Sequence, residues 1–464
     1  MPENLEAWAN LGALSKRLKE FAAAEGYYRR ACTLAPQNGD LRLAWAQALH
    51  LASRNDEALD LYRQLAEQCP DHAEVQRRLG NLYQELNQYE QATKHLQRAI
   101  ELSGRNPALL DELGIAWHRN GEVAKAIECF RESIQLQPQA GRRHFHLGMS
   151  LLLSGNFETG WDEFEWRPDG ANDPTPKPLP RWRGEPIAGR TLLMCAEEGF
   201  GDTIQFARFI PEVRRHFDCT TILYCQKPLT ALLSTCPGID QIAVVGEPLP
   251  SADFMVTLPS IPAIIRFNPL RSPANTPYLF PRPDLVTLWQ RRIAERLPAN
   301  AAPRKLRIGV AWQGDPKYGA DNLRSFPLHH FRPLAQLPHV QLISLQKGFG
   351  SEQLAAFREH SSIIDLGPEV DRDHGAFMDT AAIMGQLDLM ITSDSAIAHV
   401  AGALGIPVWI VLPKVPDWRW LLETTDSPWY PSAKLFRQKT IGHWGDVMEE
   451  VCRGISDKQL AFSN

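Results

Sequence analysis

The stretch Leu387–Leu412, LDLMITSDSAIAHVAGALGIPVWIVL, decides the fold of the C-terminal part of this 464-residue chain. It predicts a buried strand over Leu387–Thr392, a polar turn at Ser393–Ser395, a helix of small residues over Ala396–Leu404 and a second buried strand over Pro407–Leu412. A strand that runs directly into a helix start leaves backbone N–H groups at the positive end of the helix dipole, where an anion can bind. The same pattern fits an ordinary helix capped by these polar residues, so both interpretations stay open on this stretch alone.

Composition and charge narrow the class of protein. The apolar fraction is 44%, the charged fraction is 22% and the net charge is -5, which is typical of a soluble globular protein that does not bind nucleic acid. The eight cysteines form no CxxC pair and no zinc-binding spacing, so we expect reduced thiols. The N-terminus lacks the features of a signal peptide, and His399 and Pro407 interrupt the most apolar run, 396–412. We expect a cytoplasmic protein without a membrane span.

Four classes of residue recur every 34 residues in the first third of the chain. Small residues occupy two of these classes: Gly12, Ala46, Gly80, Gly114 and Gly148, and then Ala24, Ala58, Ala92, Ala126 and Gly160. A large apolar residue follows at Tyr28, Tyr62, Leu96, Phe130 and Phe164, and prolines 36, 70 and 138 end three of the units. This period and these residues are the signature of the tetratricopeptide repeat, in which each unit is a pair of antiparallel helices.

About five such units form a predicted solenoid over residues 1–167, and a solenoid of this kind presents a concave binding surface. We therefore favour recognition of a protein or peptide by the repeats, with a scaffold or an oligomerisation arm as the alternative. The last segment, Phe157–Arg167, is unusually rich in aromatic residues for an exposed end. We expect it to pack on the domain that follows.

A different pattern begins after 168–190, a stretch with six prolines that we interpret as a linker. Apolar runs of strand length alternate there with helical segments, which predicts parallel α/β sheets. The first series comprises Thr191–Ala196, Thr220–Tyr224, Gln241–Val245 and Phe254–Leu258. After a break near Pro298–Arg304, the second series comprises Leu306–Ala311, Val340–Leu345, Ile363–Leu366, Leu387–Ile391 and Val408–Leu412. We expect domains at 191–300 and 301–464, with a C-terminal helix, Trp444–Ile455, packed across both.

In open parallel sheets, ligands bind where the strands end. Gly199–Asp202 follows the first strand and opens a helix, but Ile204 replaces the third glycine of a dinucleotide-binding motif, which argues against NAD. What remains is a tight turn that presents Asp202 beside a helix start, either as a site residue or as a helix cap.

Two further turns carry polar residues in the last domain. Trp312–Asp315 follows its first strand, and Gln346–Gly348 ends another strand. Arg324 and Lys347 are the cations we expect near phosphate groups, unless both are solvated surface residues.

Asp371–Asp373 has the form of a metal-binding DxD motif, but in this loop it is better explained as a solvated turn. The histidines and cysteines lack the companion groups for a metal site or for cysteine catalysis.

Six stretches of the chain carry a resemblance to a known family: GWDEFEWR, PRWRGEPIAGRTLLMCAEEGFGDTIQFARF, AWQGDPKYGADNLRSFPL, LISLQKG, ITSDSAIAHVAGALGIPVWIVLP and PDWRWLLETTDSPWYPSAKLFRQ. On these stretches, residues 157–464 resemble bacterial proteins that fuse tetratricopeptide repeats to a GT-B glycosyltransferase module related to the heptosyltransferases. The resemblance implies two Rossmann-like domains that face a cleft, with a nucleotide sugar held by the C-terminal domain. It also implies that neither a metal nor another cofactor is required.

The resemblance implies roles for individual residues as well. Asp202 stands where heptosyltransferases carry the aspartate proposed as general base. Asp394 and Ser395 stand in the helix-start motif over the donor diphosphate, with His399 one turn along. Arg324 lies roughly where that family places a basic residue for the diphosphate. The other donor-binding residues that we expect on the turns around the site are Gly201, Thr203, Gln205, Trp312, Gly314, Gln346, Lys347 and Ser393.

These residue types suit sugar transfer from a nucleotide diphosphate. Helix-start N–H groups with Arg or Lys can stabilise the leaving diphosphate without a metal, and a carboxylate can accept the proton of the acceptor hydroxyl. The combination with repeats resembles O-GlcNAc transferase and the repeat-bearing flagellin glycosyltransferases. We therefore predict an inverting transfer to a serine or threonine hydroxyl of a protein, such as a flagellin-like protein, that the repeats recruit.

One departure and two alternatives belong with this prediction. The asparagine ladder of O-GlcNAc transferase is not reproduced, and its places hold Asn10, Ala44, Arg78, Glu112 and His146. The chain could instead be a non-catalytic scaffold whose GT-B module senses nucleotide, or a glycosyltransferase for a glycan or lipid-linked acceptor. Trp418–Trp420 resembles the repeat-bearing group alone and has no assigned role. The motifs do not identify the nucleotide or the sugar.

Overall fold

The computed structural model describes residues 4–167, 179–197, 199–272, 275–297 and 305–462. The chain divides into two compact units, Met1–Ser150 and Leu151–Asn464. Residues 168–178 of the linker predicted at 168–190 and the whole of the break predicted at Pro298–Arg304 lie outside the described residues. The domain boundaries proposed from the sequence therefore stay predictions.

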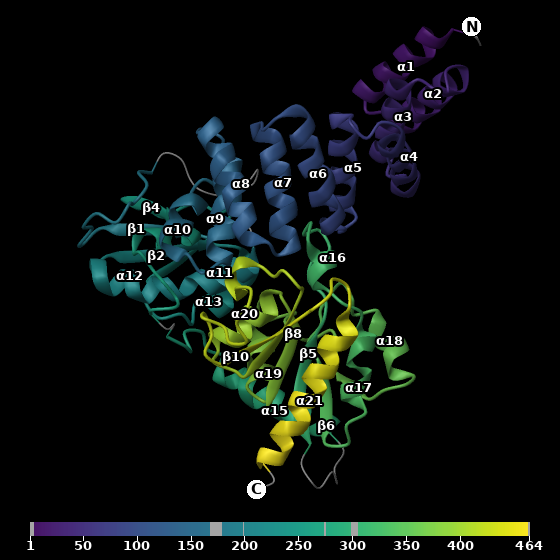
Figure 1. Ribbon diagram of the computed structural model, residues 1–464. Helices are drawn as coiled ribbons and strands as arrows, with labels where there is room; N and C mark the ends of the chain where they lie inside the picture. The colour runs from purple at the N-terminus through teal and green to yellow at the C-terminus, as the bar shows by residue number, and fades with distance from the viewer. Residues whose placement is uncertain (1–3, 168–178, 198, 273–274, 298–304, 463–464) are drawn as a thin grey trace. The chain divides into compact units, whose positions relative to one another are not determined.

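The first unit is built from consecutive helices joined by short turns, and the helices of α5–α8 lie side by side in Figure 1. Their bounds are α1 (Leu5–Arg17), α2 (Phe21–Leu34), α3 (Gly39–Leu51), α4 (Asn55–Gln68), α5 (Ala73–Glu85), α6 (Tyr89–Ser103), α7 (Pro107–Asn120), α8 (Val123–Leu136) and α9 (Gly141–Leu153). The predicted lattice of small residues lies where paired helices meet. A Cβ atom on Gly114 would lie only 2.6 Å from the ring of Phe130, and one on Gly80 only 2.8 Å from Leu96. Small residues in one helix thus make room for the large residue of the next.

The first helix of each of the first four units has a capping residue that recurs with the same period. Asn4, Asn38 and Asn106 each accept a backbone hydrogen bond from the first turn through Oδ1. His72 occupies the equivalent place and accepts from Val75 N through Nδ1. These caps satisfy N–H groups that a helix start otherwise leaves unpaired.

The second unit begins in the last turn of α9, and its first complete helix is α10 (Phe157–Phe164). It contains two parallel sheets. The first has the strand order β3-β2-β1-β4, with β1 at Thr191–Cys195, β2 at Thr220–Cys225, β3 at Gln241–Val244 and β4 at Phe254–Thr257. Its helices are α11 (Phe200–Phe206), α12 (Ile210–Phe217), α13 (Thr230–Leu233) and α14 (Ile261–Ile264). The next helix, α15 (Pro283–Arg296), packs instead on a helix of the second sheet, where Trp289 donates a hydrogen bond from Nε1 to Asp379. All four predicted strands are therefore confirmed within a residue or two of their bounds.

The second sheet has the strand order β10-β9-β8-β5-β6-β7, again all parallel. Its strands are β5 (Leu306–Ala311), β6 (Val340–Ser344), β7 (Ile363–Asp365), β8 (Leu389–Ser393), β9 (Val408–Leu412) and β10 (Ala433–Arg437). Its helices are α16 (Asp321–Arg324), α17 (Arg332–Ala335), α18 (Gln353–Arg358), α19 (Met378–Met384), α20 (Ala396–Ala403) and α21 (Trp444–Phe462). The sequence did not predict β10, because Lys434 interrupts its apolar run at the exposed edge.

Two expectations for this region are corrected. Helix α21 packs on the second sheet, where Trp444, Val447, Met448, Val451 and Ile455 join the core of that sheet, and not across both sheets. In Figure 1 it is the yellow helix in front of β5 and β6. Ser393 is the last residue of β8 and not part of the turn, so the turn into α20 consists of Asp394 and Ser395.

The aromatic residues of α10 pack on the α/β unit, as the sequence predicted. Trp161 donates a hydrogen bond from Nε1 to the carbonyl oxygen of Phe267 at 2.8 Å. Its ring meets the ring of Trp418 edge to face, with 5.3 Å between centroids, and Trp429 lies against both tryptophans. Helix α10 is therefore anchored through Trp161 on the backbone at Phe267 and on the rings of Trp418 and Trp429.

Candidate functional site

Two helix starts from different sheets meet in the second unit. Helix α11 follows β1, beside the point where the order of the first sheet reverses, and α20 follows β8, beside the reversal in the second sheet. These are the places where open parallel sheets bind ligands. The two helices pack closely, since a Cβ atom on Gly201 would lie 2.9 Å from Cδ2 of His399 and 3.6 Å from Cα of Ala396. Glycine at 201 is needed for this approach.

Asp202 lies in the first turn of α11, and its carboxylate accepts a hydrogen bond from Nη2 of Arg419. The side chain remains 41% exposed, so solvent reaches it. Its pKa is raised above the ordinary value, first because the surrounding protein displaces water, while the charge of Arg419 acts in the opposite direction. The carboxylate is therefore both accessible and more basic than an ordinary aspartate, which are the properties of a general base.

Arg419 is the centre of the polar contacts in this region. Its guanidinium donates to Asp202, to Oε1 of Gln205 and to Oδ1 of Asp417, the last at 2.9 Å. It also lies over the ring of Trp418, with 4.3 Å to the centroid. A buried guanidinium held by two carboxylates and a ring has a fixed position, and it joins α11 to the turn after β9.

Asp394 follows β8 directly and is buried. Burial raises the pKa of Asp394 to about 6, and the nearby carboxylate of Asp417 adds to this rise. Arg324 and Arg419 act in the opposite direction, as does the indole N–H of Trp420. That N–H lies close to Asp394, although not in the geometry of a full hydrogen bond. Asp394 and Asp202 therefore share one electrostatic environment with both arginines.

His399 lies one turn into α20 and is buried. Nδ1 lies 2.9 Å from the hydroxyl of Tyr430, and the ring stacks on Trp420 with 5.5 Å between centroids. Burial first, and then Arg419, Arg208 and Arg324, hold the pKa of His399 well below its usual range. The imidazole is therefore neutral at pH 7, so it can offer a hydrogen bond but not a charge.

Several buried polar atoms around these two helix starts have no hydrogen-bond partner among the described residues: Oγ of Ser393, Nε2 of Gln205 and Nε1 of Trp420. Nε1 of Trp312 also has no partner in the described ranges, but it lies beside Gly350, where an added Cβ atom would be 3.0 Å from it. Ser395 occupies the N-cap of α20, but its side chain makes no capping hydrogen bond. Since unpartnered buried polar groups are costly, a cluster of them at one place is what a polar ligand would satisfy.

The loop after β5 supplies Arg324 to the same environment. Gly314 N donates to Oγ of Ser325 at 2.9 Å, which fixes the loop against the end of α16. Nε of Arg324 donates to Asp321, and its guanidinium lies over the ring of Tyr318 at 4.4 Å. A Cβ atom on Gly314 would lie 2.7 Å from Nη2 of Arg324, so the loop passes directly beside this cation.

Three of the predicted donor-binding residues have protein partners instead. Gln346 accepts from the backbone N–H groups of Trp312 and Gln313 and donates to Phe349 O, so it holds two loops together. Nζ of Lys347 donates to the carbonyl oxygen of Val370. Thr203 donates to Gly199 O within its own helix. Their roles in binding a donor stay predictions.

The DxD segment is only partly a solvated turn. Arg372 and Asp373 are exposed and form an ion pair with each other. Asp371, in contrast, accepts from the backbone N–H and the hydroxyl of Thr380 and thereby caps α19. Within the described residues, no three His, Cys, Asp or Glu side chains come together in a way that could hold a metal ion.

Sequence reasoning missed Arg419, Asp417 and Trp420 as members of this site. The sequence feature that could have identified them is the stretch PDWRW, in which Asp417 is followed by an arginine between two tryptophans. In the structure, Asp417 caps the short turn Trp418–Trp420 by accepting from Arg419 N at 3.1 Å. That turn aims the guanidinium toward α11. Only the tertiary fold could show this direction.

Family models for the tetratricopeptide repeat match residues 5–38, 49–113 and 107–140. The chain contains tetratricopeptide repeats. Together with the helix pairs of the first unit, these matches confirm the predicted N-terminal array, and such repeats bind proteins or peptides. No helix in the described ranges has both the length and the apolar character needed to cross a membrane.

Relatives extend the comparison beyond the repeats. The chain is 24% identical to protein FlbA of Caulobacter vibrioides over 97% of its own length and 84% of FlbA. It is 25% identical to the human protein O-mannosyl-transferase TMTC1, over 33% of this chain but only 18% of TMTC1. It is 30% identical to anaphase-promoting complex subunit 3 of Schizosaccharomyces pombe, over 24% of this chain and 17% of that one.

Among solved structures, MamA from Desulfovibrio magneticus matches with a TM-score of 0.34 and 18% identity, covering 35% of this chain and 91% of MamA. YrrB, a tetratricopeptide protein with an unusual peptide-binding site, matches with a TM-score of 0.33 and 19% identity, covering 36% of this chain and 89% of YrrB.

Proposed function

We propose that the second unit is a metal-independent GT-B glycosyltransferase that moves a sugar from a nucleotide sugar to a protein hydroxyl by single displacement with inversion. We also propose that the repeats recruit the acceptor protein. The observation that carries the proposal is the meeting of two strand-to-helix turns from two parallel sheets, with Asp202 on one and Asp394 on the other. The arginines Arg324 and Arg419 lie within electrostatic reach of both carboxylates.

The parts fit the steps of such a transfer. As the sugar leaves, negative charge develops on the diphosphate, and the start of α20 with Arg324 supplies a helix dipole and a cation to stabilise it. The proton of the acceptor hydroxyl passes to Asp202, whose raised pKa and exposure suit a general base. The neutral imidazole of His399 and the Nε1–H of Trp420, which lies close to Asp394 without a full hydrogen bond among the described residues, add hydrogen-bonding groups without adding charge.

The proposal is tested with the purified full chain and a panel of UDP-, GDP-, ADP- and CMP-sugars. Sugar hydrolysis, transfer to added protein and the change in melting temperature are measured for each donor. We expect at least one donor to raise the melting temperature and to be hydrolysed slowly when no acceptor is present. The absence of hydrolysis, transfer and thermal shift for every donor would contradict the proposal.

A second candidate function follows from one contact in the same site. The hydrogen bond from Arg419 occupies the carboxylate of Asp202 in this conformation. A chain that keeps this pair would bind a nucleotide without transferring the sugar, and would act as a nucleotide-sensing scaffold for partners of the repeats. A donor that raises the melting temperature and is never turned over, with or without cell extract as acceptor, favours this alternative.

A further inference from the structure

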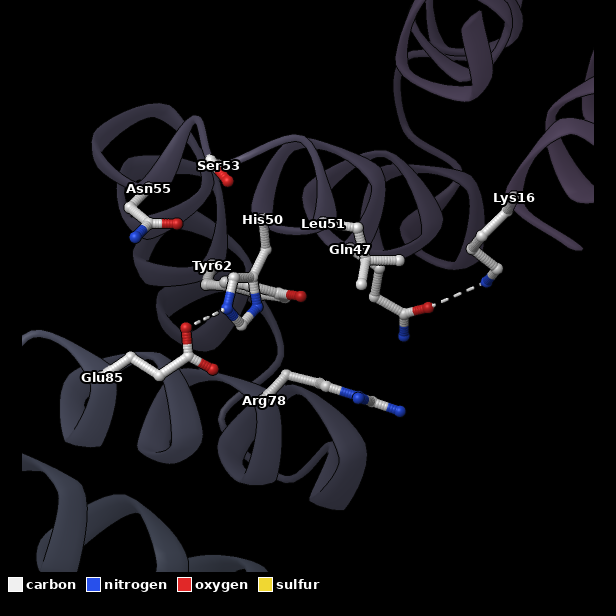
Figure 2. Close-up of a pocket in the computed structure, with 9 residues that line it drawn as sticks. All are labelled: Lys16, Gln47, His50, Leu51, Ser53, Asn55, Tyr62, Arg78 and Glu85. Atoms are coloured by element: carbon white, nitrogen blue, oxygen red, sulfur yellow. Dashed lines mark hydrogen bonds and ion pairs between the residues drawn. The ribbon is translucent and has the colours of Figure 1, made fainter. Parts of the chain in front are cut away.

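The first unit contains a polar pocket of about 620 Å³ between α1, α3, α4 and α5. Figure 2 draws its lining: Lys16, Gln47, His50, Leu51, Ser53, Asn55, Tyr62, Arg78 and Glu85. This volume holds one side chain with part of the backbone on either side of it. We propose that the pocket binds the side-chain carboxylate of an aspartate or glutamate in an extended segment of a partner protein. The inference rests on the proposed function only in that this segment would belong to the recruited acceptor.

Unused hydrogen-bond donors in the pocket favour an anion. The ammonium of Lys16 is held by the neutral amide oxygen of Gln47 at 3.2 Å, and no carboxylate in the described residues pairs with it. The amide nitrogen of Gln47 also makes no hydrogen bond within the described ranges. Arg78 uses Nε for Glu74, while its two Nη groups have no hydrogen-bond partner among the described residues. These groups together offer several N–H donors and two positive charges.

Tyr62 provides a second, independent observation. Its side chain is fully buried, yet its hydroxyl has no hydrogen-bond partner among the described residues. A buried hydroxyl without a partner is unfavourable, and here it belongs to a residue that lines the pocket. A carboxylate oxygen in the pocket would accept this hydrogen bond. Oδ1 of Asn55 is also buried without a partner in the described part, and it would accept from a backbone N–H of the bound segment.

The charges favour a carboxylate over a phosphate group. The only acidic residue of the lining, Glu85, pairs with Nε2 of His50 at 2.7 Å. In the view of Figure 2 the side chain of Arg78 extends away from Glu85 and toward the end that holds Gln47 and Lys16. Glu74 already offsets Arg78, which leaves Lys16 as the cation of the lining that has no carboxylate partner among the described residues. A single negative charge matches this balance better than the charge of almost two on a phosphate.

The test uses short acetylated and amidated peptides in which the central residue is fixed and the flanking residues are mixed. The full chain, without nucleotide sugar, captures peptides from each pool, and the captured amount is measured. We expect pools with central Asp or Glu to be captured at least about threefold better than the pools with Asn or Gln. Equal capture of these pools, or preferential capture of Lys, Arg or phosphoserine, would overturn the assignment.

Three variants locate the binding. Lys16→Gln removes the charge and should abolish the preference for acidic pools, whereas Lys94→Gln, on the exposed face of α6, should leave it unchanged. Tyr62→Phe should weaken the preference while the melting temperature stays the same or rises, because the buried hydroxyl makes no hydrogen bond within the described part of the free protein. Unchanged preference in both Lys16→Gln and Tyr62→Phe would place the binding elsewhere. Capture needs no sugar transfer, so an inactive second unit leaves this result intact.

Discussion

Arg419 donates a hydrogen bond from Nη2 to the carboxylate of Asp202, and this contact joins the helix after β1 to the turn after β9. The same guanidinium also binds Gln205 and Asp417. Because Arg419 is buried and its charge lowers the pKa of Asp202, it governs both the position and the basicity of the carboxylate. If Asp202 acts as a base, Arg419 is the residue that positions it.

Replacing Asp202 by asparagine tests the proposed base directly. Asparagine keeps the shape of the side chain but cannot accept a proton, so we expect transfer to fall by about two to four orders of magnitude. Donor binding should persist, because the donor is proposed to contact α20 and Arg324. The measurements are the transfer rate and the donor dissociation constant by calorimetry.

Asp162→Asn is the matched control for this variant, since Asp162 forms an exposed ion pair with Arg266 and should tolerate the change in both measurements. An Asp202→Asn variant that transfers sugar at the normal rate would remove Asp202 as the base. Loss of donor binding in that variant would instead assign Asp202 to the donor site.

Replacing Arg419 tests its positioning role through the pH dependence of transfer. Arg419 lowers the pKa of Asp202, so Arg419→Gln should raise that pKa and move the acidic limb of the pH–rate profile to higher pH. Arg419→Lys should keep the charge and partly restore the profile, but not the fork of hydrogen bonds. A merely structural role would lower the rate equally at every pH. Arg266→Gln, at an exposed pair, serves as the control.

The raised pKa of Asp394 leads to a prediction of how the free energy of unfolding changes with pH. Its pKa is about 6 in the folded chain and about 3.9 in an unfolded chain, so the folded state binds the proton more tightly. Below about pH 4 both states are protonated; as pH rises to about 6 the unfolded chain ionises first and the free energy of unfolding falls. The fall from this group is about 3 kcal/mol, since one pKa unit corresponds to about 1.4 kcal/mol. Asp202, also raised, acts in the same direction.

Asp394→Asn should therefore melt at a higher temperature than the unmodified chain at pH 7, and the difference should shrink toward pH 4. Thermal unfolding across this range measures it. Asp417, Arg324, Arg419 and Trp420 face Asp394, so each is left unchanged in the comparison. A difference in melting temperature that is the same at pH 4 and pH 7 would show that Asp394 is ionised at an ordinary pKa.

The sequence predicted the fold wherever the spacing of apolar and small residues reflects which positions are buried. The 34-residue lattice predicted the helix pairs because Gly80 and Gly114 pack directly beneath Leu96 and Phe130. The predicted strands were continuous apolar runs, which is what parallel sheets covered on both faces require. β10 has no such run, since it lies at the edge of its sheet and Lys434 is exposed.

The sequence predicted only part of the candidate site. Asp202 lies at the start of the helix after β1 and Asp394 directly follows β8, and this strand-to-helix pattern in the sequence identified both residues. Arg419 lies more than two hundred positions from Asp202 in the chain, and no local pattern reports a contact over that separation. Lys347 had the right charge and followed a strand, but it binds the carbonyl oxygen of Val370. The type of a residue shows which interactions its side chain can make, whereas the tertiary structure decides which group it contacts.

The repeat lattice makes one prediction about stability in which two similar substitutions have opposite effects. A Cβ atom on Gly114 would lie 2.6 Å from the ring of Phe130, so Gly114→Ala should destabilise the first unit by about 1–3 kcal/mol through overpacking. Gly26 lies inside α2 with nothing within 4 Å of an added Cβ atom. Gly26→Ala should therefore stabilise it by roughly 0.5–1 kcal/mol, since alanine favours a helix over glycine. Urea unfolding of the full chain, monitored by the circular dichroism of its helices, measures the free energy of unfolding of each variant and distinguishes the two effects. Equal effects of both substitutions would mean that Gly114 does not lie against Phe130 in solution.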